Sequence, residues 1–228
     1  MSGCGTTTED LRLHDRGVFL PSIKIAHELT DSSQSGQNNR KSRVAAELEM
    51  GHVSGTTSQG IDASQFINFG GGTFQGPDEI EGNYGLFTAS LALRLRLNDP
   101  ADIFGIAFLG GLGGQNFSLE LDDGNISSSN RIGSVGPLIG LQFSLEPYPS
   151  MDVYVRGTQV VGFGDATTSL GLVEIEMSIR PYSHLAFEGG YRIMKYRKIG
   201  SVAERIGPGE AKINLVLSGP TVGLRLDF

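Results

Sequence analysis

Apolar and polar side chains alternate along almost the whole of this chain, from Gly17 to the last residue. Successive side chains of a β-strand point to opposite faces, so a period of two residues predicts strands with one apolar and one polar face. A helical period of 3.6 residues never continues for more than about two turns. Ten strands are expected, at 17–29, 42–54, 61–70, 84–97, 102–117, 134–146, 151–162, 168–180, 184–197 and 212–228.

The connections between these strands differ in length. Tight turns are expected at 98–101, 147–150 and 181–183, and longer polar loops at 30–41, 71–83, 118–133 and 199–211. Alternation of short turns and long loops is typical of antiparallel barrels that cross a membrane. Ten strands would place both chain ends on the short-turn side. Eight strands are the alternative, if 17–29 is an extension and 54–83 is one long loop.

The domain organisation follows from the same pattern. Residues 1–16 are polar and without periodicity, so they are expected to form a tether. Residues 17–228 then form a single domain, an all-β, antiparallel up-and-down transmembrane β-barrel.

The opposite faces of the strands indicate which side meets lipid. In 84–97, the residues Leu91, Leu93, Leu95 and Leu97 share one face, and Arg94 and Arg96 lie on the other. The polar faces of all strands combine Gly, Ala, Ser and Thr with charges of both signs, which suits a narrow lumen where charges pair. An arginine facing lipid near the midplane would cost about 2–4 kcal/mol, so the leucines are expected to face lipid. A soluble barrel with its apolar face inward is the alternative.

Composition excludes some partners and chemistries. The chain has a formal net charge of −7, a pI of about 5.1 and no basic stripe, which argues against nucleic acid. No apolar run has the roughly 18 residues that a transmembrane helix needs. Because Cys4 is the single cysteine, no disulfide forms within the chain.

The last strand carries a family resemblance. The segment "GPTVGLRLDF", which ends in Phe228, resembles the C-terminal signature strand of bacterial outer-membrane β-barrel proteins. The resemblance implies residence in the outer membrane, contact with its lipid and lipopolysaccharide, and recognition of Phe228 by the barrel assembly machinery. The chain departs from the pattern at Pro220, where an aromatic residue is common, and it has no Trp. Its interfacial girdle is therefore expected from Tyr148, Tyr182, Tyr191, Tyr196, Phe163 and Phe187.

The N-terminal sequence raises a second possible membrane contact. Cys4 follows the small residues Ser2 and Gly3, which resembles the end of a bacterial lipoprotein signal, where the cysteine receives the lipid. The alternative is an incidental cysteine in the tether.

A pair of residues at 52–54 is the sharpest chemical candidate. His52 and Ser54 lie two apart on one strand face, like the His-x-Ser pair of outer-membrane lipid hydrolases, in which His activates Ser. Those hydrolases continue with Asn, where this chain has Gly55, and the third residue is a guess, Asp62. A structural histidine and a turn serine are the alternative reading.

The charged residues of the polar faces are expected to neutralise one another. Glu47 with Glu49, and Glu174 with Glu176, could in principle perform acid–base chemistry or bind a metal. Their position among arginines favours ion pairing. The expected network is Arg94, Arg96, Glu47, Glu49, Glu174, Glu176, Arg156 and Arg192. No metal site and no cofactor are expected, since His14, His27 and His184 show no ligand spacing.

Three functions are compatible with these features. The leading one is a small outer-membrane barrel with a narrow, charge-filled lumen and a structural, binding or narrow-transport role. A membrane-embedded lipid esterase using His52 and Ser54 is the second. The third is a soluble carrier of a hydrophobic ligand, resembling a lipocalin.

Overall fold

The structure is a computed structural model of the chain. It describes residues 11–16, 18–29, 44–63, 66–69, 71–99, 102–148, 150–164, 166–182, 184–201 and 213–227. Among them, no helix is long and apolar enough to cross a membrane. The strands are β1 (Leu11–Arg16), β2 (Leu20–Leu29), β3 (Val44–Ile61), β4 (Phe66–Phe69), β5 (Gly72–Gln75), β6 (Asp78–Arg96), β7 (Phe104–Asp122), β8 (Ser127–Tyr148), β9 (Met151–Gly164), β10 (Ala166–Tyr182), β11 (Leu185–Ser201) and β12 (Ile213–Asp227).

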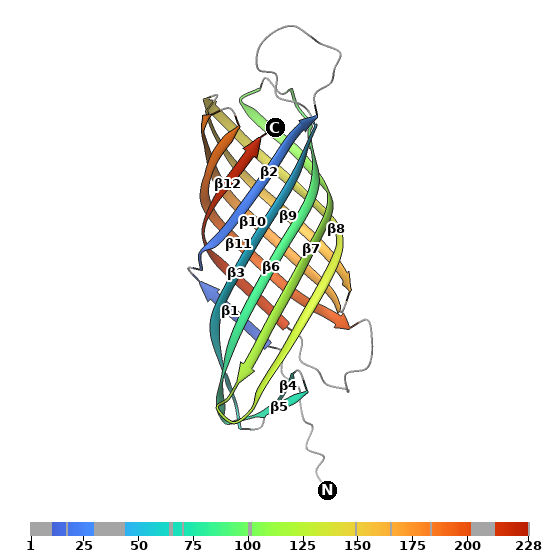
Figure 1. Cartoon of the computed structure of the whole chain (residues 1–228), viewed down its shortest axis with the longest axis vertical. Helices are drawn as coiled ribbons and strands as arrows, with labels where there is room; N and C mark the ends of the chain where they lie inside the picture. The colour runs from blue at the N-terminus through green and yellow to red at the C-terminus, as the bar shows by residue number, and fades with distance from the viewer. Residues whose placement is uncertain are drawn as a thin grey trace.

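Nine strands close into a barrel, in the order β2, β3, β6, β7, β8, β9, β10, β11 and β12 (Figure 1). Neighbouring strands are antiparallel except at the closure, where β12 pairs with β2 in parallel. The all-β, mostly antiparallel barrel confirms the sequence-based fold class at this level. The expected strand numbers, ten and eight, are both wrong.

One segment accounts for the missing tenth strand. The expected strand at 61–70 leaves the barrel and forms β4, which pairs with β5 in a separate hairpin. The preceding strand, β3, continues to Ile61 and pairs with β6 over its whole length. An odd number of barrel strands makes β2 and β12 run in the same direction, so the described chain begins and ends at opposite ends of the barrel (Figure 1). The expectation that both ends lie on the short-turn side is therefore wrong.

β1 and β2 follow one another along the edge of β12. β1 pairs with Ile213–Ser218 and β2 with Thr221–Asp227. Between them, a Cβ atom on Gly219 would lie 1.9 Å from the carbonyl oxygen of Val18, so the close approach of these backbones requires glycine. Residues 11–16, expected as part of the tether, are thus paired with the last strand.

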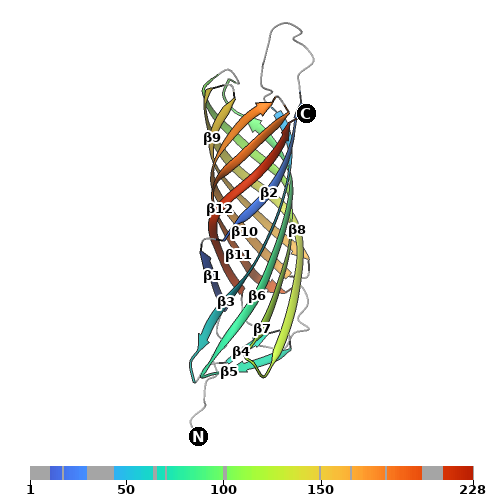
Figure 2. The same cartoon turned by 60° about the vertical axis from the view of Figure 1, so that its left-hand side comes forward.

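The strands are strongly staggered around the barrel. Starting at Ala26, successive register partners are Glu47, Ala92, Gly111, Leu138, Val160, Leu170, Tyr196, Leu215 and then Leu13. After one turn around the barrel the path thus reaches Leu13, which precedes its starting residue, Ala26, by 13 residues. Such a stagger over nine strands corresponds to the tilt of about 35–45° that is usual for barrels, and Figure 2 shows the same slant from a second side.

Side-chain polarity inverts along the barrel axis. On β6, the outward residues near the C-terminal end are Leu91 and Leu93, which are 57% and 54% exposed. Further down the same outer face lie Asn83 and Glu81, while Leu86 on the opposite face is buried. The apolar residues therefore change from the outer face to the inner face at about Leu86 and Phe87. The upper barrel, the end that carries the C-terminus in Figure 1, is apolar outside, and the lower barrel is apolar inside.

The lower barrel holds the hydrophobic core. Phe117 and Tyr196 stack across it with ring centroids 4.7 Å apart. Around them are buried Val53, Ile80, Tyr84, Leu86, Leu119, Leu121, Ile132, Met194, Ile213, Leu215 and Leu217. Packing of this kind is that of a water-soluble β-barrel.

The β4–β5 hairpin closes the lower end of the barrel (Figures 1 and 2). Its side chains Ile67, Phe69 and Phe74 are fully or almost fully buried in the same core. The hydroxyl of Ser128 on β8 donates a hydrogen bond of 2.9 Å to the carbonyl oxygen of Phe69. The hairpin therefore acts as a lid over the core.

Two of the four expected long loops, 71–83 and 118–133, are largely strand, whereas 30–41 and most of 199–211 lie outside the described residues. Residues 118–133 contain only a short turn, in which the backbone N–H groups of Ile126 and Asn125 donate to Asp123 and lower the pKa of its carboxyl group. Residues 71–83 fall largely within β5 and β6. The strict alternation of short and long connections also fails, because β2 ends and β3 begins at the end of the barrel that carries the tight turns.

A pair of glycine variants tests the close strand packing. A Cβ atom on Gly136, which faces inward, would lie 1.9 Å from the carbonyl oxygen of Val161, whereas Gly157 has no atom within 4 Å. We expect Gly136→Ala to destabilise the barrel by about 1–3 kcal/mol, the range of overpacking. Gly157→Ala should leave stability unchanged. Urea midpoints of the purified variants measure both, and equal midpoints would contradict the packing described.

Candidate functional site

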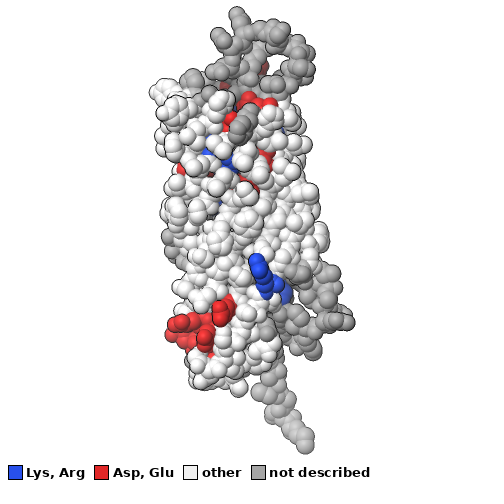
Figure 3. All heavy atoms as spheres, in the orientation of Figure 1, with Lys and Arg blue, Asp and Glu red and all other residues white. Residues whose placement is uncertain are grey.

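The outer face of the upper barrel is a continuous apolar belt. On β6 it extends from Phe87 to Leu95, on β8 from Val135 to Leu145 and on β11 from Phe187 to Ile193. Ten residues of a strand tilted by about 40° rise roughly 25 Å, which is the height of the apolar band of membrane barrels. In the face seen in Figure 3, the middle of the molecule carries almost no charged side chain, and acidic ones gather at the lower end.

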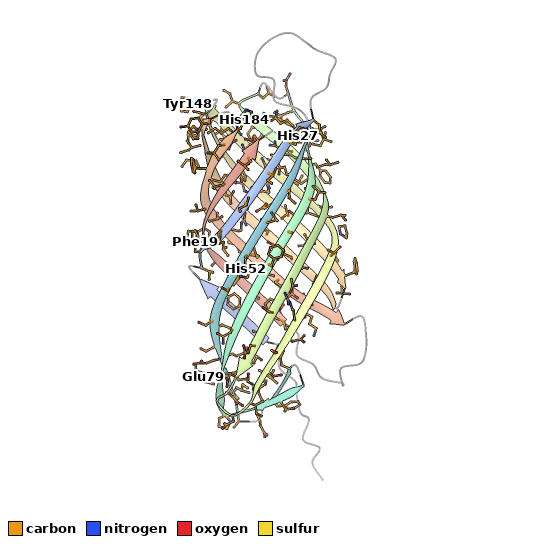
Figure 4. All side chains as sticks on the ribbon, viewed as in Figure 1. Phe19, His27, His52, Glu79, Tyr148 and His184 are labelled. Carbon is orange, nitrogen blue, oxygen red and sulfur yellow. The ribbon has the colours of Figure 1, made fainter. Side chains whose placement is uncertain are left out.

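Exposed aromatic side chains mark both edges of the belt. Tyr148 and Tyr182 lie at the upper turns and are 66% and 71% exposed. Phe19 and Phe163 lie at the lower edge, and Figure 4 places Phe19 at nearly the height of His52. Tyr196, which was expected in this girdle, is 1% exposed and lies inside, because the polarity of β11 has already inverted at its position.

Inside the belt, the centre of the lumen is a buried cluster of charges around Lys24. Its Nζ lies 2.6 Å from Oε2 of Glu176, 3.1 Å from Oε2 of Glu188 and 3.6 Å from Oε1 of Glu174. The hydroxyl of Tyr154 hydrogen-bonds to Glu176 and to Lys24. Lys24 is 4% exposed, so its charge depends on these partners for solvation.

Two arginines extend the cluster across the lumen. Arg192 Nη2 lies 2.5 Å from Glu174 Oε2 and 2.7 Å from Glu49 Oε1. Arg156 Nη2 lies 2.9 Å from Glu47 Oε2. Arg156 also donates through Nε and Nη2 to Oε1 of Gln142, at 3.0 and 2.7 Å. The bonds link strands that lie on different sides of the barrel, so the network crosses its interior.

The full network contains charges of both signs in near balance. Its cations are Lys24, Arg94, Arg96, Arg156, Arg180, Arg192 and Arg225, and its carboxylates are Glu47, Glu49, Glu146, Asp152, Glu174, Glu176, Glu188 and Asp227. Desolvated ion pairs of this kind add little stability over apolar packing, but removal of one partner is costly. The network therefore fills the lumen and fixes the arrangement of its strands.

The expected network residues come together almost completely. Of the eight, only Arg96 stands apart from the central cluster, because it lies near the upper turn and pairs with Glu146 at 2.9 Å. Lys24, the centre of the cluster, was not among the residues expected from the sequence. The signal was present, since Lys24 stands between Ile23 and Ile25 in the middle of a strand.

Two small cavities remain among these side chains. One of about 60 Å³ is lined by Lys24, Glu49 and Arg192 together with apolar residues that include Leu109 and Leu170. A second of about 30 Å³ lies towards the upper end, between Arg94, Arg96 and Arg180. Pockets that enclose a drug-sized ligand have about 300–1,000 Å³, so the upper lumen is too full to hold one.

The candidate catalytic pair lies on the outer surface. His52 and Ser54 are both exposed on the outer face of β3, at the lower edge of the belt (Figure 4). No hydrogen bond joins these two described side chains. Asp62 follows the end of β3, roughly 26 Å along the strand from Ser54 at 3.3 Å per residue. The structure does not bring the three together.

Potential metal ligands do not gather in the described part of the chain. No group of three or more His, Cys, Asp or Glu side chains there is arranged to hold a metal ion. Cys4 and Phe228, the expected lipid-attachment and assembly residues, lie outside the described residues.

The fold and this interior define a closed all-β barrel with a filled lumen, an apolar outer belt and a second, water-compatible half. Comparison of the chain with protein-family models, with curated proteins and with solved structures gives no match.

Proposed function

We propose that this chain is an outer-membrane β-barrel that does not conduct and has a structural or binding role. The observation that carries the proposal is the inversion of polarity along the axis. A belt of exposed Leu, Ile, Val and Phe side chains, backed by buried charges, suits lipid outside and protein inside. The lower barrel, with its apolar core and polar exterior, suits water. The boundary at Phe19 and Phe87 then marks one surface of the bilayer.

The interior supports a closed lumen. The ion-pair network fills the upper barrel, the apolar core fills the lower barrel, and the β4–β5 hairpin covers the lower end. A solute would have to break several buried ion pairs and then cross a dry core, so transport is disfavoured. The outward position of Leu91, Leu93 and Leu95 also disfavours a soluble carrier, in which these residues would line the ligand cavity.

In a binding role, the lower barrel would contact the partner. It extends past the belt by the length of β3 from Ser54 to Ile61, about 20 Å for a tilted strand. It presents Glu79, Glu81, Glu120 and Asp122 to water on one side. The barrel assembly machinery and membrane lipid are the partners that this proposal requires.

Detergent dependence and conductance test the proposal. We expect the purified chain to aggregate without detergent and to migrate differently on gels before and after boiling, as folded membrane barrels do. Planar-bilayer recordings should show no stable open channel. Solubility without detergent would overturn the membrane assignment, and large, stable conductance would overturn the closed lumen alone.

A further inference from the structure

Two exposed cations stand at the lower edge of the belt on β11. Lys195 and Arg197 both face outward and are exposed. They directly follow Tyr191 and Ile193, the last belt residues of that strand, which are 45% and 47% exposed. Neither cation forms an ion pair or a side-chain hydrogen bond with any residue that the structure describes.

The register partners of the two cations are small or medium-sized and uncharged. The register partners of Lys195 are Gly171 and Val216, and those of Arg197 are Ser169 and Asn214. Beside Ser169, Nε2 of Gln159 donates to its hydroxyl at 2.8 Å. No bulky side chain among these neighbours separates the two charges from a ligand.

This sector of the barrel also lacks competing carboxylates. The described outward residues of β9, β10, β11 and β12 include no Asp or Glu, because the acidic residues of these strands all face the lumen. The acidic residues of the lower exterior lie on β6 and β7 instead. Among the residues that the structure describes, no carboxylate therefore cancels the positive charge of Lys195 and Arg197.

We propose that Lys195 and Arg197 bind the phosphate of an anionic phospholipid whose acyl chains lie against the belt. The inference rests on the proposed membrane function, since the belt must be in a bilayer for the headgroup to reach this height. Cations at a lipid–water boundary attract anionic headgroups, and Arg matches phosphate with paired donors. Tyr191 and Ile193 above the cations provide the apolar surface that the lipid chain needs.

Lipid retention tests the proposal. The full chain is inserted into nanodiscs of phosphatidylcholine with or without phosphatidylglycerol, and bound lipid is measured by native mass spectrometry after release. We expect selective retention of phosphatidylglycerol, and a loss of about thirtyfold in the double variant Lys195→Gln/Arg197→Gln at low salt. Arg131→Gln is the matched control, because Arg131 is also exposed on the outer face but already donates to Asn116 at 2.9 Å.

The outcomes distinguish failure of the lipid site from failure of the proposed membrane function. If the chain inserts but retains both lipids equally, or if the double variant behaves like Arg131→Gln, the lipid site is overturned while the membrane barrel stands. Displacement of the lipid by millimolar inorganic phosphate would also overturn it, by showing that the acyl chains add nothing. If the chain does not insert at all, the proposed function itself fails.

Discussion

Replacement of Lys24 by methionine should destabilise the barrel by about 3–5 kcal/mol, the cost of leaving buried carboxylates without their cation. Lys24 is 4% exposed and lies within 3.6 Å of Glu174, Glu176 and Glu188. Methionine keeps most of the volume and removes the charge. The three carboxylates would then repel one another in a site with little solvent.

Gel mobility in a urea series measures this effect, since the chain has no Trp to report unfolding by fluorescence. Lys195→Met, measured in detergent without anionic lipid, is the control, because it removes the same charge from an exposed position and should change stability by no more than about 0.5 kcal/mol. A Lys24→Met variant as stable as Lys195→Met would show that the network is dispensable for the fold.

Replacement of Leu93 by arginine should reduce stability in a bilayer by about 2–4 kcal/mol and lower the yield of inserted protein. Leu93 is 54% exposed near the middle of the belt on β6. An arginine there would face lipid, and the residues beside it, Ala46 on β3 and Gly110 on β7, carry no carboxylate. The expected loss is specific to a membrane environment.

Asn83→Arg provides the matched comparison on the same strand and the same outer face. Asn83 lies below the belt, directly opposite Glu120 on β7. Its replacement by arginine should be neutral or slightly stabilising. Insertion of both variants into liposomes, followed by urea titration, compares them. Equal stability of Leu93→Arg and Asn83→Arg would place both positions in the same solvent and so contradict the proposed boundary.

The alternation of the sequence was sufficient to predict an all-β, mostly antiparallel barrel. The inward arginines and the apolar outer face followed from the small residues and balanced charges of the polar faces. The alternation of apolar residues in the sequence also shows where the apolar face changes from inside to outside. On β6 the apolar residues occupy even positions at Ile80, Tyr84 and Leu86, and odd positions from Phe87 to Leu97. The prediction of loops at 71–83 and 118–133 was wrong because it did not take this change of phase into account. The outward residues of these segments are polar, and they were therefore interpreted as loop residues.

The strand number could not be predicted in the same way. The lower part of β3 carries Gly55, Thr57 and Gln59 on its inner face, with no apolar alternation to mark a strand. The apolar core at that level is supplied by other strands and by the β4–β5 hairpin. Only the three-dimensional arrangement shows that β3 is continuous and that 66–69 lies outside the barrel.

The parallel seam between β2 and β12 also determines when the barrel can close. Its first register pair joins Leu20 to Thr221, almost the full length of the chain apart. Contacts between such distant segments form slowly, because the entropy of closing the intervening loop must be lost first. Until β12 is synthesised, β2 and β11 are both open sheet edges, which are liable to aggregate. The barrel therefore closes only after β12 has paired with both edges, whatever the order in which the other strands form.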